Sequence, residues 1–291
     1  SAIMAAIVNL IISIIKGVAY LFTGNVALFA ETLHSLGDSA NQFFVFIGSA
    51  LSKKAPTGRF PNGFGRLVNL VLLGAVLIVG IMSYETIKEG YLHIIKPTES
   101  SYFLVSLGVL FISVVLETFV LLKAMREIMH ETGEETTGIS YFYKSFGKYK
   151  DAKPATRLVF LEDLVATVGG LLAMIAIVIS HYSPFHAAEG IASIMIGILM
   201  LMVVGKVFLD NAAGALGEAD EVMEQYIGDK VIKEQGIQDV QDVVVIKEGE
   251  DFHVEVSVEI DPGMTMAEMD DIKDRLRSKI LQEKGVVDVL V

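Results

Sequence analysis

The stretch from Gly24 to Gln42 places groups that bind metal ions inside an apolar run. The run Val26–Leu51 is long enough to cross a bilayer, and its first half contains Glu31, His34, Asp38 and Asn41. His34 and Asp38 are four residues apart, so a helix puts them on one face. An ionisable side chain at membrane depth normally faces a cavity, a partner or an ion. One imidazole with one carboxylate is half of a site for a borderline cation such as zinc; the alternative is a structural ion pair in a helix bundle.

A second polar interruption occurs in the sequence LVFLEDLVATVGG, which contains Glu162 and Asp163. Adjacent residues on a helix point about 100° apart, so only one of these carboxylates can aim squarely at a given centre. The other would support it or pair with a base such as Arg157. Glu117, in SVVLETFVLL, is a third acid in an apolar segment. We expect Glu117 to form a hydrogen bond between helices rather than to bind metal.

Six hydrophobic segments can position these groups. The chain is 53% hydrophobic, with a mean hydropathy of +0.56, and each segment is near the roughly 20 residues that a bilayer requires. Lys16, inside the first segment, can extend its ammonium toward the membrane surface or find a carboxylate, and we expect the first. Gly169 and Gly170 permit close helix contact in the fifth. The segments are Ala2–Phe22, Val26–Leu51, Leu67–Tyr84, Tyr102–Met125, Leu158–Ser180 and Ala187–Leu209.

The distribution of basic residues predicts the orientation. Bases concentrate between segments two and three and between segments four and five, whereas the opposite side has few. The positive-inside rule therefore places both basic loops and both termini in the cytoplasm. We expect a multi-pass protein of the cell membrane, the plasma membrane of a prokaryote. The bases in these loops are Lys53, Lys54, Arg59, Arg66, Lys144, Lys148, Lys150, Lys153 and Arg157.

The C-terminal part carries the whole charge imbalance. Residues 1–217 contain 15 acids and 15 bases, and residues 218–291 contain 20 acids and 8 bases, which gives the net charge of −12. This distribution predicts a transmembrane domain over 1–213 and an acidic cytoplasmic domain over 214–291. Helical and alternating patterns predict an αββαβ order, a small α+β fold that would favour a homodimer because its core is small. The expected elements are Glu221–Gln235, Val240–Lys247, Phe252–Ile260, Met266–Lys284 and Val286–Val291.

Several functional classes lack support in the sequence. It contains no HExxH, GxSxG or Walker motif, so nothing marks an enzyme or an ATP-driven pump. It has no cysteine, which excludes disulfides and thiolate ligands. The acidic balance argues against nucleic acid as a partner, and no cofactor is expected. The remaining partners are a metal ion, protons, the lipid bilayer and a second copy of the chain.

The whole chain resembles the cation diffusion facilitator family. The most specific part is Asn9–Asn41, NLIISIIKGVAYLFTGNVALFAETLHSLGDSAN, which is similar to the family's first two helices with their His–x3–Asp pair. PNGFGR, YETIKEG and the αββαβ domain, which is similar to small metallochaperones, also match. The resemblance implies a homodimeric exporter of divalent metals driven by proton antiport. Within the family, zinc exporters repeat the His–x3–Asp pair on helix five.

At that second pair the chain departs from the family pattern. Asp163 matches the aspartate, but Val159 stands at the histidine position. The implied ligands are thus His34, Asp38 and Asp163, and the fourth is Glu162, Glu117 or water. Some members have a further metal site in the loop after helix two, and Phe60 and Phe64 replace its histidines here.

The family also pairs a base after that loop with an acid after helix six. Arg66 fits the base, while Gly217 stands at the acid position, so the resemblance implies Glu218 or Asp210 as the substitute. The cytoplasmic domains of several members bind metal through clustered histidines. This domain has only His253, so no metal is expected there.

The function expected from these features is export of Zn²⁺ from the cytoplasm in exchange for H⁺. The oxygen-rich ligand set keeps Mn²⁺ and Fe²⁺ open as substrates. A different class of protein, a membrane sensor or scaffold whose acids only hold the helices together, is the further alternative. An unperturbed imidazole titrates near pH 6.5, so protons and metal would compete for His34.

Overall fold

The computed structural model describes residues 2–60, 63–133, 138, 140–152, 154–248 and 251–291. Pro61 and Asn62 of the PNGFGR motif, and Lys153 among the loop bases, lie outside the described residues. The chain divides into a helical unit, residues 1–46 and 74–208, and a second unit, residues 47–73 and 209–291. The domain boundary that we place at residue 213 remains a prediction.

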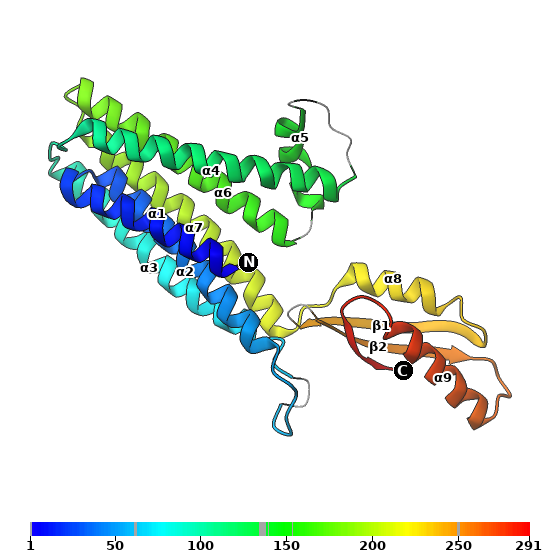
Figure 1. Ribbon diagram of the computed structural model, residues 1–291. Coiled ribbons are helices and arrows are strands. Elements are labelled where there is room, and N and C mark those ends of the chain that lie inside the picture. Colours follow the sequence, from blue (N-terminus) through cyan, green and yellow to red (C-terminus); the bar gives the residue numbers. More distant parts are fainter. Residues whose placement is uncertain (1, 61–62, 134–137, 139, 153, 249–250) are drawn as a thin grey trace. The chain divides into compact units, whose positions relative to one another are not determined.

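The six predicted hydrophobic segments form six long helices (Figure 1). Five of them are long and apolar enough to cross a membrane: α1, α3, α4, α6 and α7. The other, α2, is as long, but it contains the polar residues of Gly24–Gln42. The predicted α-helical membrane fold is confirmed. The bounds are α1 Ala2–Thr23, α2 Val26–Ser52, α3 Leu67–Ile95, α4 Phe103–Glu131, α6 Pro154–Tyr182 and α7 Ala187–Leu216.

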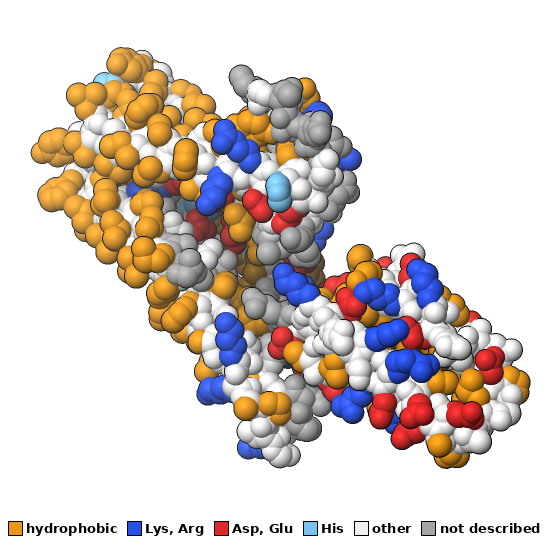
Figure 2. Space-filling model, turned by 45° about the vertical axis from the view of Figure 1, so that its right-hand side comes forward, with side chains coloured by type: hydrophobic (Ala, Val, Ile, Leu, Met, Phe, Trp, Pro, Cys, Tyr) orange, Lys and Arg blue, Asp and Glu red, His pale blue; other side chains and the backbone are white. Residues whose placement is uncertain are grey.

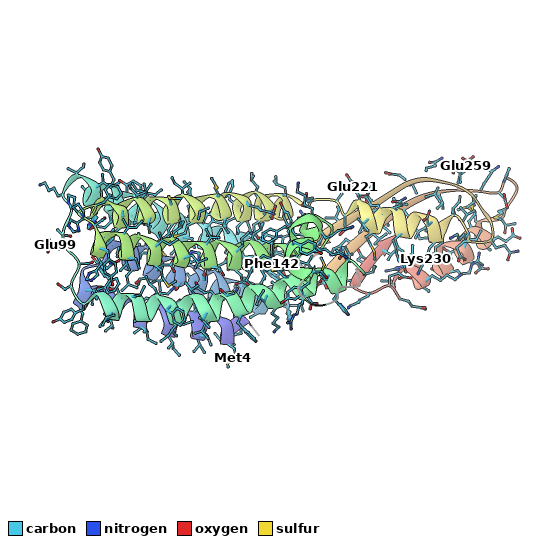
Figure 3. All side chains as sticks on the ribbon, turned by 90° about the horizontal axis from the view of Figure 1, so that it is seen from above. Met4, Glu99, Phe142, Glu221, Lys230 and Glu259 are labelled. Carbon is cyan, nitrogen blue, oxygen red and sulfur yellow. The ribbon has the colours of Figure 1, made fainter. Side chains whose placement is uncertain are left out.

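The outer surface of the helical unit is apolar, as a lipid-facing surface must be. In the view of Figure 2, hydrophobic side chains cover much of the helical unit, with some charged side chains among them, and acidic and basic side chains are numerous on the second unit. Met4, for example, is 61% exposed and projects from α1 away from the other helices (Figure 3). Such exposure is the reverse of a soluble fold, in which large apolar side chains pack inside.

Helices α3 and α7 touch backbone to backbone. A Cβ atom on Gly90 would lie 2.6 Å from the carbonyl oxygen of Gly190, and one on Gly197 would lie 2.6 Å from Ile87. The hydroxyl of Ser193 donates to the backbone oxygen of Thr86 at 2.9 Å. Small residues allow this approach in membrane bundles, so α3 and α7 form a tightly packed pair.

The basic loop between α4 and α6 contains a helix that the sequence reasoning missed. Helix α5, Ser140–Lys148, is followed by the short 3₁₀ helix η1, Tyr149–Asp151. Phe146 packs edge-on against Phe160 of α6 at 5.5 Å between ring centroids, and Phe142 packs on Phe146 (Figure 3). A helix of nine residues is marginal on its own, so aromatic packing on neighbouring helices holds it.

The C-terminal residues form the predicted αββαβ domain. The elements are α8 Glu221–Val231, β1 Ile237–Glu248, β2 Asp251–Ile260, α9 Met266–Ile280 and β3 Val286–Leu290. β1 pairs with β2 antiparallel, and β2 pairs with β3 parallel. The alternation in β2 holds: Val254 and Val256 are buried with side chains of α8 and α9, whereas Glu255 and Glu259 are exposed.

A capping box fixes the start of helix α9 in the C-terminal domain. The hydroxyl of Thr265 accepts a hydrogen bond from the backbone N–H of Glu268, whose carboxylate accepts one from the N–H of Thr265. This capping box lowers the pKa of Glu268. Its stabilising effect is therefore present at neutral pH and is lost as the pH falls through that lowered pKa.

Arg66 pairs with an acid that we did not predict. Its Nε lies 2.7 Å from Oε1 of Glu248, at the end of β1. The expected partners, Glu218 and Asp210, are wrong because the side chain of Arg66 packs against Gly217 and reaches the buried carboxylate of Glu248. Oε2 of Glu248 lies 3.4 Å from His253. The start of α3 is thereby tied to the sheet.

Candidate metal centre

His34 and Asp38 form the core of the candidate site on α2. The side chain of Asn25 caps this helix: its Oδ1 accepts a hydrogen bond from the backbone N–H of Leu28 at 2.9 Å, which fixes the start of the helix. Nε2 of His34 lies 3.5 Å from Oδ2 of Asp38. The imidazole is buried, with 6% of the side chain exposed, and it has no hydrogen-bond partner at Nε2. The carboxylate of Asp38 is 32% exposed. An unpartnered buried nitrogen beside a carboxylate is suited to binding a cation.

A cavity of about 30 Å³ opens beside this pair. By volume it holds an ion or one to two water molecules. The polar lining comes from α2 and α6, with Asn41 and Glu162 beside the His34–Asp38 pair. The opposite wall comes from α3 and α7 and is apolar. Its residues are Ala75, Val76, Val79, Met200, Val203, Val204 and Val207.

Glu162 and Asp163 occupy different positions at the site, as their 100° separation predicts. Glu162 lines the cavity and accepts a hydrogen bond from Nδ2 of Asn41 at 2.9 Å. Asp163 is not among the cavity-lining residues, but it interacts electrostatically with Asp38 and His34. Its Oδ2 is buried without a hydrogen-bond partner. Val159, at the position of the family's histidine, is 41% exposed.

These residues do not yet form a closed ligand shell. Among the described residues, no group of three His, Asp or Glu side chains stands close enough together to hold a metal ion. His34, Asp38 and Glu162 line one cavity, and Asp163 lies outside its wall. Binding through all four would therefore require a side-chain rotation or a small helix movement that brings Asp163 inward. The ligand set remains a prediction.

Lys16 behaves differently from our expectation. It does not extend to the membrane surface: its side chain is 1% exposed, and its Nζ lies 2.9 Å from Glu31 and 3.0 Å from Glu117. Two carboxylates inside the bundle hold the ammonium more favourably than an apolar route to the surface. Glu117, as predicted, joins helices through hydrogen bonds. The sequence did contain a signal for this pairing: Lys16 lies in one apolar segment, and the acids Glu31 and Glu117 lie in two others.

The two aromatic residues in the loop after α2 pack on each other. The ring centroids of Phe60 and Phe64 are 5.1 Å apart. In the second unit, His253 faces Glu248 and Asp288, whose Oδ2 lies 3.9 Å from Nδ1. Both of these ion-pair partners are carboxylates, and no metal site is assigned there.

Two family models together match nearly the whole chain. Residues 2–214 match the cation efflux transmembrane domain, and residues 219–291 match the cytoplasmic domain of cation efflux proteins. The chain is a member of the cation diffusion facilitator family. The cation diffusion facilitator fold explains why the polar groups concentrate on α2 and α6 inside an apolar helical unit.

Relatives of this cation diffusion facilitator include transporters and magnetosome proteins. The human mitochondrial proton-coupled zinc antiporter SLC30A9 is 28% identical over 213 residues, 70% of this chain and 35% of the relative. The human probable proton-coupled zinc antiporter SLC30A4 is 23% identical, and the match covers 97% of this chain and 67% of SLC30A4. Magnetosome protein MamB of Magnetospira sp. (strain QH-2) is 23% identical, and the match covers 92% of this chain and 85% of MamB. The chain thus spans about a third of the length of SLC30A9.

Replacing Glu162 with glutamine separates a ligand from a supporting residue. Glutamine keeps the length of the side chain and can still meet Asn41, but it removes the negative charge that binds a cation. We expect metal affinity to fall about tenfold to a hundredfold, measured by titrating the purified protein with Zn²⁺. Unchanged affinity with lower expression would assign Glu162 a structural role only.

Proposed function

We propose that this chain exports a divalent metal cation, foremost Zn²⁺, from the cytoplasm in exchange for protons. The observation that carries the proposal is the His34–Asp38 pair, 3.5 Å apart, on the polar wall of a small cavity within apolar helices. The family membership and the proton-coupled zinc antiport named for SLC30A9 and SLC30A4 support it. The protein acts in the cell membrane, with both termini in the cytoplasm.

The donor set decides which cations fit. An imidazole nitrogen favours zinc and its transition-metal neighbours over Mg²⁺ and Ca²⁺, which prefer oxygen alone. The oxygen donors of Asp38, Glu162 and Asp163 outnumber that nitrogen, so Mn²⁺ and Fe²⁺ form a second candidate class of substrate. The bilayer is the barrier, and the site is reached from each side in turn.

Proton coupling follows from the chemistry of the ligands. Zinc binds the neutral imidazole and the ionised carboxylates, so a bound ion excludes protons from these groups. When the ion leaves, the nearby carboxylates of Asp38 and Asp163 resist ionising together and take up protons. Protons entering from outside thus displace the metal, and their loss to the cytoplasm restores the site.

Flux into proteoliposomes tests the proposal. Vesicles containing the purified protein, loaded with a metal indicator and a pH dye, are expected to take up Zn²⁺ and to change internal pH in the opposite direction. Parallel runs with Mn²⁺ and Fe²⁺ rank the substrates. Absence of flux with every metal would favour the sensor or scaffold class, and metal flux without a pH change would remove the antiport.

His34 also supplies a prediction about pH and metal preference. Metal affinity of the wild-type protein is expected to fall as the pH falls, because protons compete with the metal for the imidazole and carboxylate ligands. His34→Asp should move the dependence to lower pH and shift preference from Zn²⁺ toward Mn²⁺, since a nitrogen ligand becomes oxygen. Titrations at several pH values measure both. A pH-independent zinc affinity in the wild type would rule out competition at this site.

The C-terminal domain is proposed to hold a homodimer together. Its core is small, and the polar face of its sheet stays exposed in one chain. Deleting residues 218–291 should weaken dimerisation and lower transport while leaving metal binding in the helical unit. Light scattering in detergent and a Zn²⁺ titration measure the two effects. Loss of all metal binding on deletion would place the site in the domain instead.

A further inference from the structure

A buried charge cluster of Lys16, Glu31 and Glu117 lies outside the lining of the candidate metal cavity. Lys16 of α1 donates to Oε2 of Glu31 on α2 at 2.9 Å, to Oε1 of Glu117 on α4 at 3.0 Å, and to the hydroxyl of Ser35 at 2.9 Å. An ammonium group has three N–H donors, and each of these has an acceptor. Lys16 is therefore fully satisfied as a cation.

The cluster has one more acid than base. The side chains of Lys16 and Glu31 are 1% and 0% exposed, and that of Glu117 is 15% exposed. Among the ionisable groups on neighbouring helices, α2 adds the base His34 and the acid Asp38, and α6 adds the acids Glu162 and Asp163, so acids still outnumber bases. Two ionised glutamates would leave a net charge of −1 in an apolar interior, which is strongly unfavourable.

Two oxygens of the cluster lack donors. Oε1 of Glu31 and Oε2 of Glu117 are buried without a hydrogen-bond partner. Both lie against α6: a Cβ on Gly169 would be 2.7 Å from Oε1 of Glu31, and one on Gly170 would be 3.4 Å from Oε2 of Glu117. In the middle of a helix the backbone N–H groups are already used, whereas each carbonyl keeps a second lone pair. An ionised carboxylate would leave a negative charge on such an oxygen without a donor, which is unfavourable in an apolar interior, whereas a protonated carboxyl group would not.

We propose that this cluster is a second proton-binding site, separate from the metal ligands, with the proton on Glu31. The carboxylate of Glu117 accepts from both Lys16 and Ser113, while that of Glu31 accepts from Lys16 alone. Glu31 is also the more deeply buried. Hydrogen bonds stabilise the ionised form of a carboxyl group, so Glu31, which accepts fewer of them, is the acid on which we place the proton.

A role in transport follows, and this part rests on the proposed function. Glu31 is three residues, about one helical turn, from His34. A divalent cation at His34 and Asp38 favours the ionised form of a nearby carboxyl group, so metal binding releases the proton of Glu31. Loss of the metal restores it. The cluster thus adds to the protons that the ligands themselves exchange.

Infrared spectroscopy of the metal-free protein in lipid tests the site without any transport. Glu31→Gln is expected to remove the C=O stretching intensity of one carboxylic acid at neutral pH. Glu117→Gln should do the same, because Lys16 then balances an ionised Glu31; this variant serves if Glu31→Gln does not fold. Ser113→Ala, which removes a hydrogen bond but no acid, should keep the full intensity. Unchanged carboxylic-acid intensity in both glutamine variants would overturn the proposal.

Proton release on Zn²⁺ binding tests the link to transport. Calorimetry in buffers of different ionisation enthalpy measures the number of protons released per Zn²⁺ bound. This number should be lower for Glu31→Gln than for Ser113→Ala, by up to one proton. Equal proton release would overturn the coupling of the cluster to the metal. Failure of the protein to bind Zn²⁺ would contradict the proposed function, and the infrared measurement would still decide whether Glu31 holds a proton.

Discussion

Replacing Asp38 with alanine is expected to abolish metal transport while the protein remains folded and dimeric. Asp38 is the carboxylate 3.5 Å from the imidazole of His34, and it lines the cavity. Changes in groups that only support a metal ligand already lower affinity or activity 10- to 100-fold, so the loss of a ligand should exceed about 100-fold. Metal uptake into proteoliposomes measures the effect, and size-exclusion chromatography checks the fold.

Asp163→Ala should have the same consequence, and Asp210→Ala is the matched control. Asp163 has a buried oxygen without a partner, which is costly in a membrane unless an ion binds there. Asp210 is an exposed aspartate on α7, and its replacement should leave the uptake rate unchanged. Wild-type uptake by either Asp38→Ala or Asp163→Ala would show that the ligand assignment is wrong.

Replacing Lys16 with methionine is expected to destabilise the helical unit by about 3–5 kcal/mol, the usual effect of removing one partner from a buried ion pair. Glu31 and Glu117 would lose their common donor and their counter-charge. Unfolding in mixed micelles titrated with a denaturing detergent measures the change. Lys206→Met on α7 is the control, because Lys206 is only half-buried, whereas Lys16 is fully buried.

Replacing all three ionisable residues of the cluster, Lys16, Glu31 and Glu117, by methionine should recover most of this stability. An apolar cluster of similar volume has no charge to compensate, and such replacements are often neutral or stabilising. The comparison distinguishes an effect of charge from one of packing. Equal instability of the single and triple variants would show that the shape of the lysine side chain, rather than its charge, holds α1, α2 and α4 together.

The long helices and the terminal domain were predictable because their signals are local. Apolar length identified the helices, and the alternation in β2 identified the strand. The positions of His34 and Asp38 on one face of α2 followed from a four-residue spacing alone. Those features depend on residues close together in the chain, where helix and strand geometry fixes the neighbours.

The features that sequence reasoning missed depend on distant pairs. Glu117 is 101 residues from Lys16, so the apolar setting of Lys16 suggested the surface. Arg66 meets Glu248 only because β1 ends beside the start of α3. The position of Asp163 outside the cavity wall could not be derived either, since a rotation of α6 by a fraction of a turn decides it.

The apolar wall that α3 and α7 give to the cavity has a consequence for hydration. A metal ion held by α2 and α6 meets protein donors on one side only, because the described lining residues of α3 and α7 offer no oxygen or nitrogen side chain. In the proposed site, any coordination position that His34, Asp38, Glu162 and Asp163 leave open would be filled by water, and the ion would then cross partly hydrated. Selection then acts on how readily an ion exchanges part of its water shell. Mg²⁺, which dehydrates reluctantly, is held back by slow ligand exchange as much as by weak affinity.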